Sequence, residues 1–418
     1  MSSTHTLGRS GPSRWHVLIG GFLAYLFDAM EIILLTIALP VMRQDLELSI
    51  NDAGMLASAT LLGIGLSGVT TGWYSDNFGR RKALLASLII FGSLTMLVAS
   101  TRDWGLLLLL RFLSGIGLGG VWGIVSAYIC ETWPPHQRAR ATGFVLSSFP
   151  VGAGIAALLA GALLPNWPLL FLLAGISTLI PVLYIFLFVP ESSEWKASKA
   201  LRQHCANVTT QVSISEIFAP QLRRLTLIGT FAATCAVIGF WGASTWLPTY
   251  LVQERGLDVS VMSSFIAMLN VGAFIGINAF GLIADHIGKR NATLLSLLGC
   301  AVMLAIYSQT RENNLLFWLG PVYAFFYAFA SLFASYFSAQ FPVRVRTLGA
   351  GFCFNFGRGL AAFAPLLLSS IAASYSLALG LLVCAGFFAV ATLSMFFMPA
   401  DNALGAEGST VEAPASGR

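Results

Sequence analysis

Charged residues are scarce in this chain. Of its 418 residues only 10% are Asp, Glu, Lys or Arg, and 56% are hydrophobic. An ordinary soluble domain carries about 25% charged residues, so this chain cannot cover its surface with groups that water solvates. The apolar runs recur from one end to the other, which predicts an integral membrane protein rather than a domain with one anchor. The net charge of +5 is spread over short loops and does not indicate nucleic-acid binding.

Several kinds of chemistry lack the residues they need. No phosphate-binding glycine loop is present, which argues against transport driven by ATP, and no nucleophile lies beside a base, so we expect neither an enzyme nor a cofactor. The six cysteines show no CxxC pair and no metal-ligand spacing, which predicts free buried thiols and no metal. All five histidines lie in or beside predicted loops, so any proton coupling within the membrane depends on carboxylates.

Polar breaks divide the apolar sequence into about twelve predicted membrane helices. The longest internal polar stretch, 191–222, separates two sets of six. We therefore expect an all-α membrane protein with a cytoplasmic tail (1–14), an N-terminal six-helix bundle (15–190), a cytoplasmic connection (191–222), a C-terminal six-helix bundle (223–399) and a disordered cytoplasmic tail (400–418). The predicted helix cores are 15–41, 51–75, 83–100, 104–128, 141–164, 167–189, 223–250, 260–284, 291–309, 314–338, 347–373 and 376–399.

The distribution of lysine and arginine predicts the orientation. If the N-terminus lies inside, inner segments hold 17 of the 23 basic residues and outer loops hold four. Cytoplasmic loops carry such an excess in membrane proteins. Both termini are therefore expected in the cytoplasm, with the protein in the plasma (inner) membrane.

The two halves contain related segments. GWYSDNFGRRK (72–82) returns as GLIADHIGKR (281–290), an offset of 209, and RARATG (138–143) returns as RVRTLG (344–349), an offset of 206. Two matches at nearly the same offset indicate a duplicated six-helix unit. Many transporters build a site at the membrane midplane between such repeats.

These loop segments resemble the cytoplasmic signature of the major facilitator superfamily. RFLSGIGLGG (111–120) and VPESSEW (189–195) are similar to its fourth helix and to the end of its sixth. The resemblance spans essentially residues 15–399 and implies the major facilitator fold. The residues that match the loop signature are Gly72, Asp76, Gly79, Arg80 and Arg81 in the first copy and Gly281, Asp285, Gly288 and Arg290 in the second.

Finer features resemble the organic-acid:proton symporters, which include carriers of sialic acid and aromatic acids. Asp28 and Glu31 resemble the pair of acids in their first helix, and TWLPTYL (245–251) and FNFGRG (354–359) are similar to their seventh and eleventh helices. Ala29 replaces the glycine that often follows the first acid. The resemblance implies import of an organic anion in symport with protons by a carrier that works as a monomer.

Asp28 and Glu31 are the expected proton-coupling residues. They are three residues apart and share one face of the first helix, with Asp28 about 20 Å along it from Trp15, near mid-bilayer. A carboxylate in hydrocarbon costs at least about 2.5 kcal/mol, so such a pair needs a function. Burial and the nearby like charge favour the neutral acid, whereas an arginine nearby favours the ionised one. The alternative is that one acid caps a neighbouring helix or pairs with arginine. Glu31 is slightly favoured as the acid that lines the site.

Arg358 is the expected substrate-binding residue. It lies about 18 Å along the eleventh helix from Arg346, and its guanidinium fits a carboxylate. Asn355, one turn away, is expected to assist. The alternative is a permanent ion pair between Arg358 and Asp28 or Glu31. A third membrane arginine, Arg111, is expected either to attract the anion and influence the acids, or only to pair with a helix.

The loop motifs are expected to form a gate rather than a substrate site. Asp76 can pair with arginine or cap the end of a neighbouring helix, and Arg80 and Arg81 can reach Glu131 or helix carbonyls. Topology alone could also explain these charges. The expected gating residues are Gly72, Asp76, Gly79, Arg80, Arg81, Glu131, Arg138, Arg140, Asp285, Gly288 and Arg290.

Two other functions remain open. A proton-coupled efflux antiporter of a lipophilic compound would not need Arg358. A sensor on the same fold would bind a ligand without moving it. The sequence predicts as partners a small organic anion, protons and the lipid bilayer.

Overall fold

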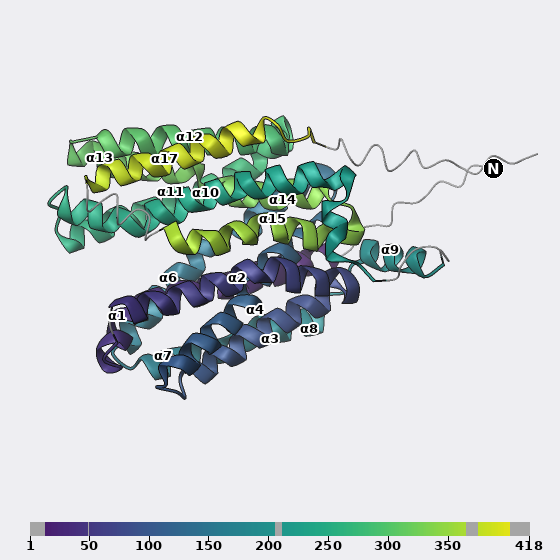
Figure 1. Cartoon of the computed structure of the whole chain (residues 1–418), viewed down its shortest axis with the longest axis horizontal. Coiled ribbons are helices and arrows are strands. Elements are labelled where there is room, and N and C mark those ends of the chain that lie inside the picture. Colours follow the sequence, from purple (N-terminus) through teal and green to yellow (C-terminus); the bar gives the residue numbers. More distant parts are fainter. Residues whose placement is uncertain (1–12, 49, 205–210, 365–374, 402–418) are drawn as a thin grey trace, which may run out of the picture.

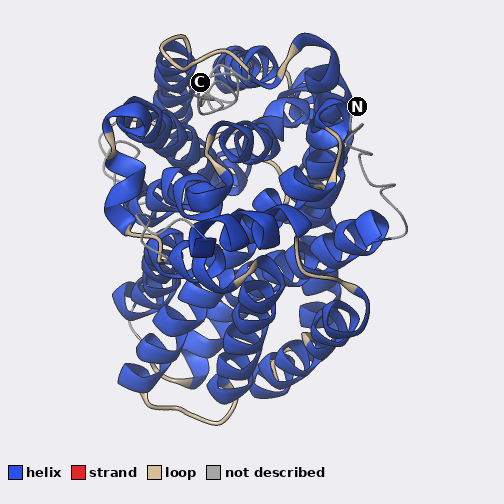
Figure 2. Cartoon of the chain, turned by 90° about the vertical axis from the view of Figure 1, so that its right-hand side faces the viewer, coloured by secondary structure: helices blue, strands red, loops and turns tan. Residues whose placement is uncertain are grey.

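The computed structural model describes residues 13–48, 50–204, 211–364 and 375–401. These residues form helices joined by short loops and turns, and no strand occurs among them (Figure 2). The main helices of the first half are α1 (Ser13–Asp45), α2 (Ile50–Phe78), α3 (Arg80–Val98), α4 (Trp104–Thr132), α5 (Arg138–Leu146), α6 (Ser148–Leu163), α7 (Trp167–Ser177) and α8 (Leu179–Phe188).

The second half begins after a short connecting helix, α9 (Ser193–His204). Its helices are α10 (Pro220–Gln253), α11 (Val259–Ile287), α12 (Lys289–Gln309), α13 (Asn313–Phe325), α14 (Phe329–Gln340), α15 (Arg346–Leu360) and α17 (Leu377–Met395). Short 3-10 turns lie at Pro135–Gln137, Ile214–Phe218, Phe326–Ala328, Val343–Val345 and Ala361–Phe363.

The two sets of helices form two layers. Helices α1–α8 make one layer and α10–α17 the other, with α2 and α15 side by side where the layers meet (Figure 1). On another part of the interface α11 packs mainly on α5, and α15 also contacts α4. We call these two layers the N-terminal and C-terminal halves.

Ten helical segments of the described chain are long and apolar enough to cross a membrane. Large apolar side chains cover their outer faces; Leu158 is 76% exposed and Phe186 is 60% exposed. Such a surface suits hydrocarbon and not water. The protein is therefore a multi-pass membrane protein.

Helical residues occupy the described part of all twelve predicted cores, but several of the helices are interrupted. The fifth core is divided between α5 and α6 at Ser147, and the sixth between α7 and α8 at Thr178. A 3-10 turn separates α13 from α14 in the tenth core. The end of the eleventh, 365–373, lies outside the described residues, as do most of the predicted tails. The 191–222 segment contains α9 and a 3-10 turn where we expected only a polar connection.

The duplicated loop motifs form matching tight turns. Gly79 (φ 118°) joins α2 to α3 and Gly288 (φ 87°) joins α11 to α12. Residues other than glycine rarely adopt this backbone conformation. A Cβ at either glycine would lie 2.3 Å from a carboxylate oxygen, of Glu191 or Asp401 respectively. The sequence repeat is thus also a repeat in space.

Both turns lie at the same end of the bundle, where α9 also packs (Figure 1). We call this the basic end, because it carries Arg80, Arg138, Lys289, Arg344 and Arg346. Its location in the cytoplasm stays a prediction.

Candidate functional site between the two halves

Asp28 and Glu31 lie on α1 and are both fully buried. The charged groups nearest to them differ, because Glu31 faces α3 and α4 whereas Asp28 faces a charge of the other half. The sequence treated the two as one pair. The structure gives each a separate environment.

Glu31 forms a buried ion pair within the N-terminal half. Its Oε1 lies 2.7 Å from Nη1 of Arg111 and accepts a hydrogen bond of 2.6 Å from Oγ1 of Thr95. Nε of Arg111 also donates to Oγ1 of Thr60 at 3.3 Å. The charge of Arg111 is therefore balanced by Glu31, and Arg111 carries no uncompensated charge for a substrate.

Asp28 has no such partner. Both of its carboxylate oxygens are buried without a hydrogen bond among the described residues. Arg358 and Tyr25 lie close enough to interact with it electrostatically. An unpaired polar group in a dry interior is costly, so this carboxyl group needs a proton or a ligand.

Arg358 faces the site from α15 in the other half. It is 4% exposed, its Nη1 has no hydrogen bond, and it forms no ion pair with any described residue. The permanent ion pair that the sequence left open as an alternative is thus absent from this part of the chain. An acid and a base from opposite halves remain available to a ligand.

Residues around Arg358 join the two halves. One turn before it, Nδ2 of Asn355 donates 2.7 Å to the carbonyl of Gly119 on α4, while its Oδ1 is buried without a partner among the described residues. The rings of Phe354 and Trp122 stack across the same interface with centroids 4.1 Å apart. Asn355 therefore has one polar atom bound to the other half and one available to a ligand.

Asp76 closes the basic end below this site. Its carboxylate pairs with Arg80 and accepts backbone hydrogen bonds of 3.2 and 2.8 Å from Thr347 and Leu348, the first residues of α15. A carboxylate is stabilised at a helix N-terminus, because the N–H groups there are unpaired. The helix-end contact expected from the sequence is present, and it joins the two halves.

Glu131 forms ion pairs with two arginines, one from each half. Arg80 of its own half lies 2.8 Å away and Arg346 of the C-terminal half 3.3 Å away. Arg346 also binds Glu194 of α9 at 3.1 Å, and Arg138 lies 3.8 Å from the same carboxylate. Helix α9 is therefore part of this contact.

The second copy of the motif makes the matching helix-end contact, because the backbone N–H groups of Ala139 and Arg140 hydrogen-bond to Asp285. Its ion pair is looser. Nε of Arg140 lies 3.9 Å from Asp285, whose side chain is 10% exposed. Nearby, Arg344 binds Glu216 at 2.6 Å, and this hydrogen bond raises the pKa of Arg344. Where Asp76 is fully buried, Asp285 keeps some contact with solvent.

Arg81 and Arg290 behave alike and do not bridge the halves. Arg81 donates to the carbonyls of Ile185 and Phe186 on α8, and Arg290 donates to those of Met395 and Phe396. Both fasten a helix end inside their own half. Their predicted part in gating stays a prediction.

Gly72 lets α2 and α15 approach closely. A Cβ on it would lie 2.7 Å from Cα of Leu348. The hydrogen bonds and ion pairs that join the halves in the described chain lie near the basic end or at mid-helix. The basic end is therefore closed in this structure.

Residues 17–321 match the family model of the Major Facilitator Superfamily. The chain belongs to this superfamily. The match covers more than half of its 418 residues. The protein is accordingly a transporter and not an enzyme.

Curated members of the superfamily are similar over almost the whole chain. A cis,cis-muconate transport protein of Acinetobacter baylyi is 29% identical over 405 residues, which is 95% of this chain and 98% of that protein. The sialic acid transporter NanX of Escherichia coli is 25% identical over 89% of this chain and 91% of its own length.

Solved structures show the same fold at lower identity. The proton:xylose symporter XylE has a TM-score of 0.78 at 15% identity, over 95% of this chain and 99% of its own. The human organic anion transporter MFSD10 has a TM-score of 0.68 at 17% identity, over 92% and 100%. These likenesses confirm the major facilitator fold.

Some residues of the site had no signal in the sequence. Thr95 and Tyr25 lie in apolar runs, where their contacts with Glu31 and Asp28 follow only from how the helices pack. Trp122 was not singled out either. Glu191 and Glu194 lie in the segment that resembled the superfamily, yet neither was singled out.

No metal site is found among the residues that the structure describes. They contain no group of three or more His, Cys, Asp or Glu that could hold an ion. Five cysteines are buried and free, and Cys205 lies outside the described residues.

Proposed function

We propose that this transporter imports a small organic carboxylate together with protons by alternating access. Arg358 binds the carboxylate, Asn355 supports it, and Asp28 takes the proton. The observation that carries the proposal is the pair of buried, unpaired groups, Asp28 and Arg358, which face each other from opposite halves. The names of the relatives, among them transporters of muconate, sialic acid and benzoate, support the substrate class.

A count of buried charge explains the coupling. With the site empty, ionised Asp28 and Arg358 together carry no net charge. A carboxylate that binds Arg358 adds one negative charge to a dry interior, which is costly. Protonation of Asp28 restores neutrality, so the anion and one proton bind together.

We propose Asp28 as the proton site, where the sequence left Asp28 and Glu31 both open. The sequence slightly favours Glu31 as the acid that lines the site, but Glu31 is paired with Arg111 and accepts a hydrogen bond from Thr95. Asp28 lacks such partners in the described chain. In this proposal Arg111 does not bind substrate; it fixes Glu31 and keeps α1 against α4.

We further propose that the basic end faces the cytoplasm, that the protein lies in the inner membrane, and that one chain suffices for transport. The excess of basic residues at inner segments supports the orientation. In that orientation the closed basic end separates the site from the cytoplasm. The contacts of Asp76 and Glu131 must then break before substrate is released inside.

Proton uptake into proteoliposomes tests the proposal. The purified chain is reconstituted with a pH dye inside, and muconate, sialate, benzoate or xylose is added at mildly acidic outer pH. One class of carboxylate should acidify the lumen, and xylose should not. Arg358→Lys keeps the charge but loses the two-pronged geometry, and it should lower apparent affinity at least tenfold.

Two variants test the proton role of Asp28 and control for nonspecific effects of mutation. Asp28→Asn should abolish acidification but keep exchange of labelled substrate, whereas Arg223→Lys, an exposed position on α10, should behave as the natural chain does. Acidification that survives Arg358→Ala would rule out the binding role. No acidification by any carboxylate, from folded protein, would favour the efflux antiporter.

A further inference from the structure

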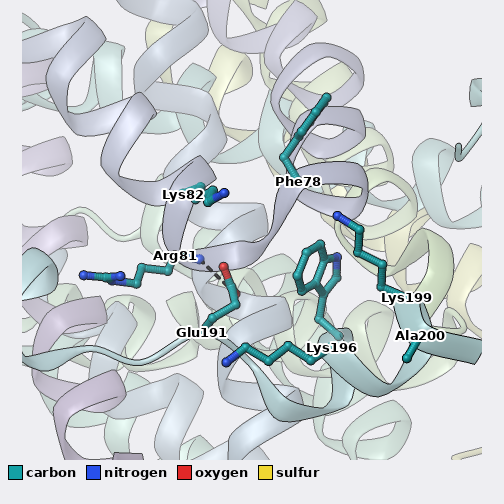
Figure 3. A pocket seen from close by; sticks show the side chains of 8 residues that line it. Phe78, Arg81, Lys82, Glu191, Lys196, Lys199 and Ala200 are labelled. Atoms are coloured by element: carbon teal, nitrogen blue, oxygen red, sulfur yellow. Dashed lines mark hydrogen bonds between the residues drawn. The ribbon is translucent and has the colours of Figure 1, made fainter. Parts of the chain in front are cut away.

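A basic pocket of about 400 Å³ lies at the basic end, outside the transport site. Its walls come from the end of α2, the start of α3, the residue Glu191 and helix α9 (Figure 3). The lining residues are Phe78, Arg81, Lys82, Glu191, Trp195, Lys196, Lys199 and Ala200.

We propose that this pocket binds the phosphate headgroup of an anionic phospholipid. Its charged lining includes three lysines and a single carboxylate, while the guanidinium of Arg81 points away toward carbonyls of α8 (Figure 3). Oε1 of that carboxylate, Glu191, accepts hydrogen bonds from the backbone N–H groups of Arg80, Arg81 and Ser192 at 2.8–3.2 Å. The side chains of Lys82 and Lys196 form no ion pair or hydrogen bond among the described residues, so their charges are open to an anion.

The walls of the pocket are fixed in place. Nε1 of Trp195 donates 2.9 Å to the carbonyl of Asp76, and Glu194, beside it on α9, pairs with Arg346. Lys199 extends over the ring of Trp195, with its Nζ 4.9 Å from the ring centroid. Because these side chains are already held in place, a ligand would lose little affinity to the entropic cost of ordering them.

The position of the pocket favours a lipid over a soluble phosphate. Phe78, in its wall, is 42% exposed and stacks on the exposed Tyr74. On the other side Arg81 lies over the ring of Phe186, which is 60% exposed. The pocket thus opens where the apolar outer surface of α2 and α8 meets the basic end. Acyl chains can follow that surface while the phosphate reaches the lysines.

Native mass spectrometry of the delipidated full-length protein tests this inference. Phosphatidylglycerol and phosphatidylcholine are titrated separately at equal concentration. We expect one tightly retained phosphatidylglycerol and weaker retention of phosphatidylcholine. The double variant Lys82→Gln/Lys196→Gln should lose about 10- to 30-fold in affinity for phosphatidylglycerol.

Matched variants separate the site from general charge. Arg223→Gln/Arg224→Gln removes two charges from the same end of the other half and should leave the affinity unchanged. Lys82→Arg/Lys196→Arg keeps the charges and should keep binding, which guards against a Gln variant that merely folds poorly.

Three outcomes would overturn the inference. They are equal retention of the two lipids, an equal loss in the Arg223/Arg224 control, and full displacement of phosphatidylglycerol by millimolar inorganic phosphate. The last would assign the pocket to a soluble phosphate.

Discussion

At the scale of single residues, two acids one turn apart do different work because their neighbours differ. Glu31 meets a guanidinium and a hydroxyl of its own half. Asp28 meets an arginine that belongs to the other half and forms no hydrogen bond with it. In the proposed mechanism, a group whose partner lies in the other half changes its surroundings with each cycle, whereas a group paired within one half keeps its partner.

The Glu31–Arg111 pair should behave as a structural unit. Arg111→Met leaves a buried carboxylate without its cation, and breaking a buried pair in this way costs about 3–5 kcal/mol. Since 1 kcal/mol shifts the melting temperature of a large domain by about 2–4 °C, we expect a fall of about 10 °C. The double variant Glu31→Gln/Arg111→Met should recover most of it, as thermal unfolding in detergent would show. A double variant as unstable as Arg111→Met would mean that the ion pair is not the cause.

At the scale of helices, the contact of α2 with α15 depends on the absence of side chains. Gly72 faces Leu348, and further along Gly65 faces Gly359, where an added Cβ would lie 2.8 Å from the other glycine's Cα. Close backbone approach of this kind is typical of membrane helix pairs. The basic end can close only while these positions stay small.

Gly72→Ala should therefore weaken closure of the basic end. Its methyl group would have to push Leu348 away, so α15 would separate from α2 more often. Cys130, whose Sγ contacts the carbonyl of Ser338 across the interface at 3.2 Å, reports on this. We expect several-fold faster alkylation of Cys130, measured by peptide mass spectrometry. Gly154→Ala, with open space around the added Cβ, is the matched control and should not change the rate.

Helices and turns were largely predictable from the sequence, and the partners of the site residues were not. Length and hydropathy are local properties, so the twelve cores could be placed, and the glycine turns at Gly79 and Gly288 followed from the repeated motif. The Glu31–Arg111 pair depends on how α1 and α4 pack, 80 residues apart in sequence. The breaks at Ser147 and Thr178 lie within continuous apolar runs and gave no signal.

At the scale of the whole molecule, the proposed cycle moves no net charge. One carboxylate and one proton cross together, and Asp28, Arg358 and the Glu31–Arg111 pair stay within the protein. A potential set with valinomycin and potassium should therefore leave the initial rate of monocarboxylate uptake unchanged. A carrier that moved one net charge would gain about 2.3 kcal/mol per 100 mV. Uptake that rises steeply when the lumen is made negative would contradict the one-proton count.

The two copies of the loop motif should contribute unequally to closure. Both carboxylates accept backbone hydrogen bonds, but Asp76 is fully buried and paired with the buried Arg80, whereas Asp285 is partly exposed and 3.9 Å from the half-exposed Arg140. Hydrogen bonds to a charged group contribute about 1.5–3 kcal/mol, and exposed pairs below about 1 kcal/mol. Asp76→Asn should accordingly lower the melting temperature by several degrees and Asp285→Asn by much less. Equal shifts would show that the two halves carry the closure evenly.

The two copies of the duplicated unit also differ in the charged residues that close the basic end. At the offset of 209, Glu131 corresponds to Gln340 and Arg80 to Lys289. Gln340 donates to the carbonyl of Ala400 at the end of its own half and offers no negative charge to the opposite one. A chimera built from two N-terminal halves would hold two acids at this position and resist opening at the basic end, and one built from two C-terminal halves would hold none. After the duplication, the loss of a single carboxylate in one copy would suffice to make the closed contact at the basic end weak enough to open.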